Sequence, residues 1–457
     1  MQDNILLNTD SYKHSHFLQY PEGTEYVYSY IESRGGEYDK TVFFGLQMFI
    51  KKYLMEPITF NNYIDAKYTC KEHGIPFNEE GWKYILEHHS GYLPIEIHAA
   101  PEGTVVDTHN VLATIVNTDP KCFWLTSFLE TALLRAIWYP TTVATKSWHI
   151  KQKIKRYYEN TSDAPLSEVD FKLVDFGARG VSSEESAAIG GLAHLVNFKA
   201  TDTLSAIIAA ENYYHSRMAG FSIPASEHST ITSWGKENEV VAYKNMVEKF
   251  GDHMAYSVVS DSYDIVNAVE NIWGKDLKDL VNSKTARLVV RPDSGDPIMT
   301  PINCILTLME KYGFTKNSKG WRVLPDNIRV LQGDGIDEKD LEEILHTMWL
   351  YNLSAENIVF GMGGGLLQKC DRDTQKFAMK CSAVRVNGEW RDVYKEAPGK
   401  ASKRGRLALI KENSKYITVA HDGNVLDDEL RLVYRNGDLM VDDTLEEIRN
   451  RTNGDHK

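Results

Sequence analysis

Seven short apolar runs recur along the middle of the chain, separated by stretches with the apolar spacing of amphipathic helices. The helical stretches include residues 203–214, 263–273 and 337–349. Strand, helix and strand at intervals of roughly 25–40 residues predict βα units around a parallel sheet. Seven such units in succession favour a closed α/β barrel over a short open sheet. The seven runs are 171–176, 194–202, 220–225, 255–261, 286–293, 328–334 and 357–361.

The flanking parts of the chain have a different pattern. Strand-like runs come early in the chain, at 27–30, 42–45, 95–99 and 111–116. Apolar stretches at 123–139 and 142–158 predict two helices, because Pro140 is expected to end the first of them. Strand-like alternation returns near the end of the chain, at 378–396, 406–410, 416–420 and 430–439.

These patterns predict an α/β fold: an irregular α/β barrel plus a mixed α+β domain built from the N- and C-terminal segments. The expected parts are an N-terminal α+β part over 1–165, the barrel over 166–377, and C-terminal strands over 378–457 that pack back on the N-terminal part. No Pro- or Ser-rich linker separates them, so we expect one rigid body.

Composition and charge narrow the function. The chain has 457 residues, of which 42% are hydrophobic, and a net charge of −13. An acidic chain argues against general binding to nucleic acid or to an anionic membrane, although a local basic cluster can still bind a small anion. Five cysteines without a CxxC pair indicate reduced thiols rather than a disulfide framework or a zinc site. Without a leader-like N-terminus or a long apolar run, we expect a cytoplasmic protein.

The sequence contains few motifs that indicate a known chemistry. The pairs His14/His16 and His88/His89 have no carboxylate at ligand spacing, so we interpret them as surface residues and predict no metal-ligating side chains. GxxxxGK[ST] and GxGxxG are absent from a strand–turn–helix setting, and no GxSxG elbow supports a serine nucleophile.

The ends of the predicted barrel strands carry the chemical signal. Each of the seven runs closes on charged residues, a histidine or glycines, and active sites of α/β barrels are built at these carboxyl ends. For any single position, turn formation or helix capping explains the residue equally well. A ring of polar groups is the better interpretation of the whole set: Asp175, Arg179, Asp202, Glu227, His228, Asp261, Arg291, Asp293, Asp334 and Gly363–Gly365.

A basic segment stands out in the acidic chain. Residues 395–406, KEAPGKASKRGR, contain five basic residues and one acidic residue. Such a segment is either a solvated loop or a basic entrance to the site that attracts a polyphosphate substrate, and the sequence favours neither interpretation.

Several motifs, in order and over nearly the whole chain, resemble the nicotinamide phosphoribosyltransferases, a barrel-type family related to the nicotinate phosphoribosyltransferases. They include TDSYKHSH at 9–16, DFGARGVSSEES at 175–186, PASEHSTITSWG at 224–235, RPDSGDP at 291–297 and GMGGGLLQK at 361–369. The resemblance implies transfer of phosphoribose from 5-phosphoribosyl 1-pyrophosphate to nicotinamide in NAD salvage. It also implies Mg²⁺, ATP as phosphoryl donor to a histidine, and a homodimer with shared active sites.

The resemblance also implies roles for individual residues of the barrel. Phe176 would stack on the pyridine ring and Asp202 would accept a hydrogen bond from its carboxamide. His228 would be the histidine that ATP phosphorylates, with Glu227 beside it and Asp261 nearby. Further substrate contacts are implied for the base and phosphate region (Arg179, Arg291), the ribose (Asp293, Gly333, Asp334) and the 5′-phosphate (Gly363, Gly364).

Residues outside the barrel are implied too. Tyr12, Arg34, Arg372 and Lys380 match positions that in the family come from the second subunit, and Lys403 or Arg404 matches a basic residue near the phosphates. The chain departs from the family pattern by having Ala178, Met362 and Ala378, of which Ala378 removes one hydrogen-bond donor near the pyrophosphate.

Three alternatives remain at this point. In a nicotinate phosphoribosyltransferase the substrate carries a carboxylate, which Asp202 would repel, so this residue favours the amide. A non-catalytic binding protein need not keep His228, Asp261, Asp293 and Asp334 together. An unrelated phosphosugar barrel enzyme predicts a Schiff-base lysine or an acid/base pair at a strand end, and no such lysine is found there.

Overall fold

The structure is a computed structural model that describes residues 4–395, 402–423 and 425–454. The chain divides into two compact units, which are described separately. Unit 1 comprises Met1–Thr145, Ala209–Ser216 and Cys370–Lys457, and unit 2 comprises Lys146–Ile208 and Arg217–Lys369. Across the described residues, no helix has both the length and the apolar character needed to cross a bilayer.

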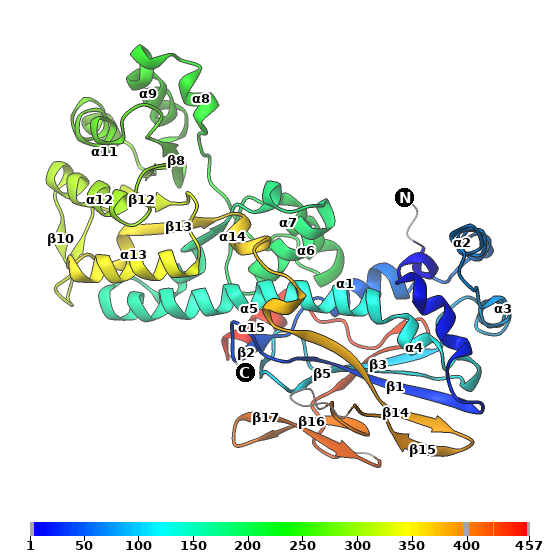
Figure 1. Ribbon diagram of the computed structural model, residues 1–457. Helices are drawn as coiled ribbons and strands as arrows, with labels where there is room; N and C mark the ends of the chain where they lie inside the picture. The colour runs from blue at the N-terminus through cyan, green and yellow to red at the C-terminus, as the bar shows by residue number, and fades with distance from the viewer. Residues whose placement is uncertain (1–3, 396–401, 424, 455–457) are drawn as a thin grey trace. The chain divides into compact units, whose positions relative to one another are not determined.

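Unit 1 is built on a seven-stranded sheet that joins both ends of the chain (Figure 1). β1 (Thr24–Ser33) pairs antiparallel with β14 (Phe377–Val386) on one side and with β5 (Val111–Asn117) on the other. Burial covers most of β1, so the sheet forms part of the core of this unit. The sheet order is β15-β14-β1-β5-β3-β18-β19, with β15 at Glu389–Asp392, β3 at Ile95–Ala99, β18 at Arg431–Arg435 and β19 at Asp438–Leu439.

Shorter strands and helices complete unit 1. β2 (Lys40–Val42) pairs with β4 (Val105–Asp107), and β16 (Arg406–Glu412) pairs with β17 (Lys415–His421). Local signals set the helix ends: α2 (Phe60–His73) begins after the capping box of Thr59 and ends at Gly74, whose φ of 80° suits glycine. The other helices here are α1 (Leu46–Phe49), α3 (Glu79–His88), α4 (Leu125–Phe128) and α15 (Leu445–Asn453).

The expected break at Pro140 is wrong, because one helix, α5 (Glu130–Thr161), runs through it. The proline ring packs against Gly45, where a Cβ atom would come within 2.3 Å of it. Next to it, the Thr141 hydroxyl donates to the carbonyl of Phe44 at 3.1 Å. These tertiary contacts offset the loss of the helix hydrogen bond that proline, which has no N–H, cannot donate to the carbonyl of Ala136.

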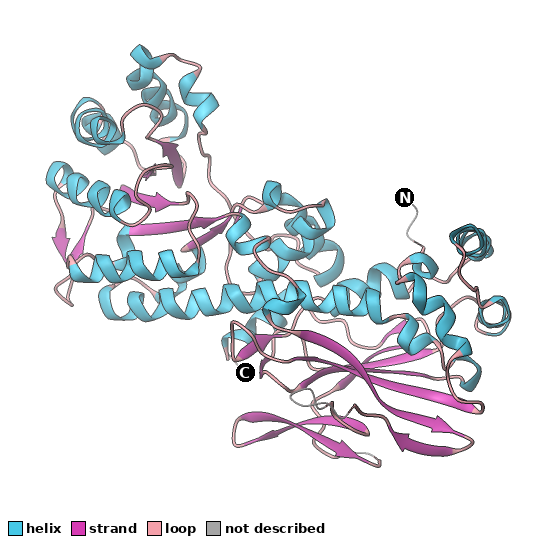
Figure 2. Cartoon of the chain, viewed as in Figure 1, coloured by secondary structure: helices cyan, strands magenta, loops and turns pink. Residues whose placement is uncertain are grey.

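Unit 2 contains a curled, six-stranded parallel sheet in the order β7-β6-β13-β12-β9-β8. Helices flank the strands (Figure 2), among them α6 (Glu184–Leu195), α9 (Glu239–Phe250), α12 (Met299–Tyr312) and α13 (Glu338–Leu350). The α/β prediction is therefore confirmed. The strands are β6 (Leu173–Asp175), β7 (Ala200–Thr201), β8 (Ala255–Val259), β9 (Arg287–Arg291), β12 (Ile328–Gln332) and β13 (Ile358–Met362).

The two edges of this sheet are bridged by an irregular segment, 221–226. The amide of Thr201 donates to the carbonyl of Phe221 and the amide of Ser226 to that of Ser257, each at 3.0 Å. The predicted strand over 220–225 is thus a bridging segment with isolated pairs, and not a strand.

The strand predicted over 194–202 is also mostly wrong. Helix α6 runs to Leu195, and only the two residues of β7 are extended. His194 is fully buried and its ring lies 3.2 Å from the carbonyl oxygens of Leu173 and Ala200. The run is apolar because it is buried, and periodicity cannot distinguish a short buried strand from the end of a buried helix. Where one helix was predicted over 263–273, the structure has a short α10 (Ile265–Asn267) followed by a π-helical segment (Ala268–Asp276).

Candidate active site

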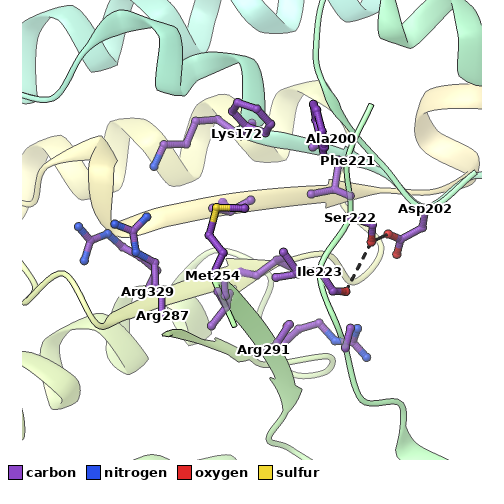
Figure 3. A pocket seen from close by; sticks show the side chains of 18 of the residues that line it. Lys172, Ala200, Asp202, Phe221, Ser222, Ile223, Met254, Arg287, Arg291 and Arg329 are labelled. Carbon is purple, nitrogen blue, oxygen red and sulfur yellow. Dashed lines mark hydrogen bonds between the residues drawn. The ribbon is translucent and has the colours of Figure 1, made fainter. Parts of the chain in front are cut away.

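A cavity of about 340 Å³ lies among the barrel strands of unit 2 (Figure 3). Its lining follows the alternation of inward-facing positions, such as Val289 and Arg291 on β9. The middle of the cavity is apolar, and polar groups lie at both ends. Those at the carboxyl ends of the strands are Asp202, Ser222 and Arg291, and those towards the amino ends are Lys172, Arg287 and Arg329.

Phe176 forms an aromatic wall of this cavity, directly after β6. Its amide donates to the carbonyl of Met362 at 3.0 Å. Two glycines make room for its ring, because a Cβ atom on Gly361 would lie 2.1 Å from Cε2 and one on Gly333 would lie 3.0 Å away. The buried carboxylate of Asp175 holds the turn by accepting from the amide of Gly177 at 2.7 Å. The ring is therefore fixed in place before a ligand arrives.

Asp202 follows β7 and is oriented by Ser222. The Ser222 hydroxyl donates to Oδ1 of Asp202 at 2.5 Å, and no donor among the described residues reaches Oδ2 (Figure 3). Desolvation raises the pKa of this carboxyl, Asp175 raises it further, and Ser222 and Arg291 partly oppose the shift. Asp202 thus presents one oxygen that a donor on a flat ligand in the cavity can reach.

Two buried donors of the cavity have no hydrogen-bond partner among the described residues: Nε of Arg291 and the hydroxyl of Ser257. Buried polar groups are rarely left without hydrogen bonds, so groups of this kind fit the wall of a ligand site. The nearest carboxylate oxygen to the Arg291 Nε, Oδ1 of Asp293, lies 3.6 Å away.

A histidine and three carboxylates form a second group at the same strand ends. Nε2 of His228, the first residue of α8 (His228–Thr232), lies 3.1 Å from Oδ1 of Asp261, and Nδ1 lies 3.7 Å from Oδ2 of Asp293. Ser294 donates to the other oxygen of Asp261, whose side chain is only 3% exposed. Burial, together with the charges of Asp293 and Asp261, raises the pKa of Asp334.

Glu227 lies beside this group in sequence but belongs to a different hydrogen-bond system. It is the N-cap of α8 and accepts from the hydroxyl of Ser229. In the described structure it has no hydrogen bond to His228 or Asp261, so its contacts are those of a capping residue.

The glycines after β13 are not required by packing. A Cβ atom on Gly363 would meet its nearest atom at 3.4 Å and one on Gly364 at 4.0 Å, which are ordinary van der Waals contacts. Arg179 is exposed on a neighbouring 3₁₀ turn, Ala178–Gly180, where a Cβ on Gly180 would lie 3.3 Å from the amide nitrogen of Gly364.

The implied phosphate-side residues of unit 1 line a separate cavity of about 1020 Å³. Its wall carries six Lys and Arg residues against Glu32 and Asp373, so it is strongly basic. Glu32 pairs with Arg34 at 2.8 Å and with Lys403. The sequence-predicted members of this wall are Arg34, Arg372, Lys380, Lys403 and the departure Ala378.

Tyr12 is not part of this wall. It lies on a 3₁₀ helix, Ser11–Leu18, is 60% exposed, and contacts His16 edge-on at 5.0 Å between ring centres. Of the basic segment 395–406, residues 396–401 lie outside the described residues, while Lys395 and Lys403 line the cavity.

Sequence reasoning missed the residues that orient the others. Ser222 and Ser294 donate hydrogen bonds to Asp202 and Asp261, and Asp175 was noted only as a strand end. Ser294 lies inside RPDSGDP, which is the one signal that pointed to it.

A curled parallel α/β sheet with an aromatic wall, carboxylates and arginines at its strand ends fits an enzyme of the phosphoribosyltransferase class, and comparisons with known proteins agree. The nicotinate phosphoribosyltransferase (NAPRTase) family profile matches residues 171–438, and that of the nicotinamide phosphoribosyltransferase N-terminal domain matches 4–97. The chain belongs to the nicotinate phosphoribosyltransferase family.

Curated relatives span the whole chain. A nicotinamide phosphoribosyltransferase of Xanthomonas campestris is 53% identical, with 98% of this chain and 97% of the relative covered. One of Acinetobacter baylyi is 32% identical with the same coverage.

Solved structures share the fold at low identity. The nicotinate-nucleotide pyrophosphorylase of Pyrococcus furiosus gives a TM-score of 0.64 at 17% identity, covering 99% of this chain and 96% of that one. Human nicotinic acid phosphoribosyltransferase gives 0.59 at 14%, covering 97% and 92%.

Proposed function

We propose that this enzyme transfers phosphoribose from 5-phosphoribosyl 1-pyrophosphate to nicotinamide, in NAD biosynthesis. The pyridine nitrogen forms a bond to the anomeric carbon while the bond from that carbon to pyrophosphate breaks, giving nicotinamide mononucleotide. The observation that carries the proposal is Asp202, held by Ser222 with Oδ2 available beside the aromatic wall of Phe176. The names of the Xanthomonas and Acinetobacter relatives support the same substrate.

Asp202 accounts for selection of an amide over an acid. An ionised carboxylate accepts a hydrogen bond from a carboxamide N–H₂ but repels a second carboxylate. Desolvation strengthens this discrimination, because the charge of nicotinate would lie near that of Asp202 in a medium less polar than water.

The strand-end groups suit the sugar and phosphates. We assign Asp293, Gly333 and Asp334 to the ribose, where carboxylates stabilise the positive charge that develops at the anomeric carbon. Gly363 and Gly364, where packing of a Cβ atom would not require glycine, are assigned to the 5′-phosphate. Arg179 and Arg291 would neutralise the phosphates from the other side.

Magnesium fits the residues present. Carboxylate oxygens are the hard ligands that Mg²⁺ prefers, and the ion commonly takes one or two of them together with substrate phosphates. Within the described part of the barrel no three carboxylates converge closely enough for an all-protein cage. Asp261, Asp293 or Asp334 would therefore hold the ion together with the substrate, and the ion would neutralise the leaving pyrophosphate.

His228 is proposed to couple ATP to the synthesis. With its Nε2–H shared with Asp261, the lone pair of Nδ1 can attack the γ-phosphorus of ATP. The N–P bond forms as the bond to the ADP oxygen breaks, and water later hydrolyses the phosphohistidine to phosphate. Half of the imidazole is exposed, so a nucleotide can reach it.

A homodimer with shared sites is proposed for the residues of unit 1. Tyr12 would supply the second face of the aromatic slot to the partner, and Arg34, Arg372 and Lys380 would supply positive charge. Tyr12→Ala and Phe176→Ala homodimers should each be nearly inactive. Random pairing of the two variants makes half of the dimers mixed, with one complete site each, so about a quarter of the activity should return. Verified mixed dimers without recovery would show that the site lies within one chain.

The decisive experiment compares kcat/KM for nicotinamide and nicotinate. The wild-type enzyme should prefer nicotinamide, and Asp202→Asn should lose about 1–3 kcal/mol of transition-state binding and relax the discrimination. Glu310 is an exposed carboxylate on α12, and Glu310→Gln is the matched control, which should change the kcat/KM of neither substrate. A wild-type preference for nicotinate, or an unchanged ratio in Asp202→Asn, would refute the assignment.

Phosphoryl transfer is tested separately. Labelled ATP should leave acid-labile phosphate on the native protein and on His253→Ala, an exposed-histidine control, and none on His228→Ala. Label that persists on His228→Ala overturns this part and leaves the transfer reaction standing.

A further inference from the structure

Three side chains of metal-binding type converge in unit 1, among residues to which the proposed reaction assigns no role. A ring nitrogen of His89, a carboxylate oxygen of Asp119 and the sulfur of Cys122 all lie within 4.8 Å of one another. It is the only such group of three among the described residues. Sequence spacing did not reveal it, because 29 residues separate the histidine from the aspartate.

The fold holds these three residues by local capping contacts. His89 closes α3, where its amide donates to the carbonyl of Ile85 at 3.0 Å. Asp119 is the N-cap of the 3₁₀ helix Pro120–Cys122, and its Oδ1 accepts from the amide of Lys121 at 2.8 Å. Cys122 is fully buried beneath them. The backbone thus presents all three ligand atoms from regular, capped segments.

Few other contacts engage the three ligand atoms in the described structure. Oδ2 of Asp119 lies 2.9 Å from Nε2 of His89 and accepts from the hydroxyl of Tyr84 at 3.0 Å. The ammonium of Lys121 lies over the Tyr84 ring, 4.6 Å from its centre, and forms no ion pair with Asp119. No hydrogen bond involves the Cys122 sulfur in the described structure. An incoming cation therefore meets a carboxylate whose sole ion-pair partner among the described residues is an imidazole.

The ligand set selects the metal. Thiolate, imidazole and carboxylate together suit Zn²⁺ or a similar transition ion, whereas Mg²⁺ prefers oxygen ligands alone. With metal–nitrogen and metal–oxygen bonds near 2.1 Å, tetrahedral angles place the nitrogen and oxygen about 3.4 Å apart. The present 2.9 Å separation of Nε2 and Oδ2 must widen by about 0.5 Å.

We propose that His89, Asp119 and Cys122 form a binding site for a divalent transition metal, with zinc as the best-matched ion and solvent as the fourth ligand. The metal–sulfur bond forms as the thiol releases its proton to the solvent, and the imidazole binds through Nε2 with its proton on Nδ1. His89 and Asp119 keep 22% and 18% exposure, which provides the entry path. The bound ion would tie the end of α3 to the turn that precedes α4.

The test uses Co²⁺ as a spectroscopic probe and Zn²⁺ as competitor on the full-length protein. Co²⁺ should give a near-ultraviolet thiolate charge-transfer band with one equivalent bound, Zn²⁺ should abolish it, and Zn²⁺ should raise the melting temperature. Cys122→Ser should lose the band. His89→Ala, which changes a half-buried side chain and avoids a core defect, should weaken Co²⁺ binding by at least about tenfold.

Matched controls separate this site from the other cysteines and histidines. His88→Ala, at the exposed neighbouring position, and Cys70→Ser, whose sulfur lies 3.5 Å from His14, should both retain the band. No band in the wild-type protein, or one unchanged in His89→Ala or Cys122→Ser, overturns the proposal.

Discussion

Gly361 controls the position of the aromatic wall, and Gly361→Ala should damage catalysis without touching a substrate. The new Cβ atom would lie 2.1 Å from Cε2 of Phe176. Carbon atoms pack at about 3.5 Å, so the ring must move by about 1.4 Å. A displacement of about 1 Å can cost about a hundredfold in rate, so we expect kcat/KM for nicotinamide to fall by roughly this factor, or about 3 kcal/mol.

Steady-state kinetics of a double-mutant cycle with Phe176→Ala provides the assay. If Gly361→Ala acts through the ring, it should cost little once the ring is absent, so the two effects should be far from additive. Gly333→Ala places its Cβ atom 3.0 Å from Cε2 of Phe176, a milder contact, so its kcat/KM should lie between those of the wild type and Gly361→Ala. Gly423, with no neighbour within 4 Å, is the control position. Additive losses in the cycle would refute this explanation.

Three further expectations concern single side chains. Ser222→Ala should raise the KM for nicotinamide about fivefold in steady-state assays, since Asp202 loses a donor worth about 1 kcal/mol. Burial raises the pKa of Glu102 to about 7, so between pH 4.5 and 7 the folded state binds more protons than the unfolded state. The free energy of unfolding of the protein should therefore fall as the pH rises through this window. In urea titrations, Glu102→Gln should remove on the order of 3 kcal/mol of that fall. Burial lowers the pKa of Lys172 to about 7, so above pH 7 the unfolded state binds more protons than the folded state. The free energy of unfolding of the wild type relative to that of Lys172→Met should therefore rise by about 1.4 kcal/mol per pH unit between pH 7 and 10. A difference that does not change with pH would contradict this.

The barrel shows where local pattern is sufficient. The runs that became β8, β9, β12 and β13 are apolar, β-branched and bounded by turn residues, so strand formation follows from local sequence. The segment 220–225 has the same pattern but forms isolated pairs only, because its partners lie on strands at opposite edges of the sheet. Pairing of that kind depends on closure of the whole sheet, which no short window of sequence contains.

The candidate site shows the same division. Motifs located Phe176, Asp202 and His228, since turn and strand-end chemistry is local. The orienting contacts from Ser222 and Ser294 join residues 20 and 33 positions away from their partners, and spacing along the chain gave no reason to pair them.

By itself, the sequence determined most strands of the parallel sheet, the strand-end position of the reactive groups and the family, because these depend on periodicity, turn residues and contiguous motifs. Only the tertiary structure decided which helix tolerates Pro140, which glycines make room for Phe176, and that His89 meets Asp119 and Cys122. The physical reason is that these outcomes depend on atoms brought within a few ångströms by folding of distant segments. Packing and hydrogen-bond energies act at that range, whatever the separation in sequence.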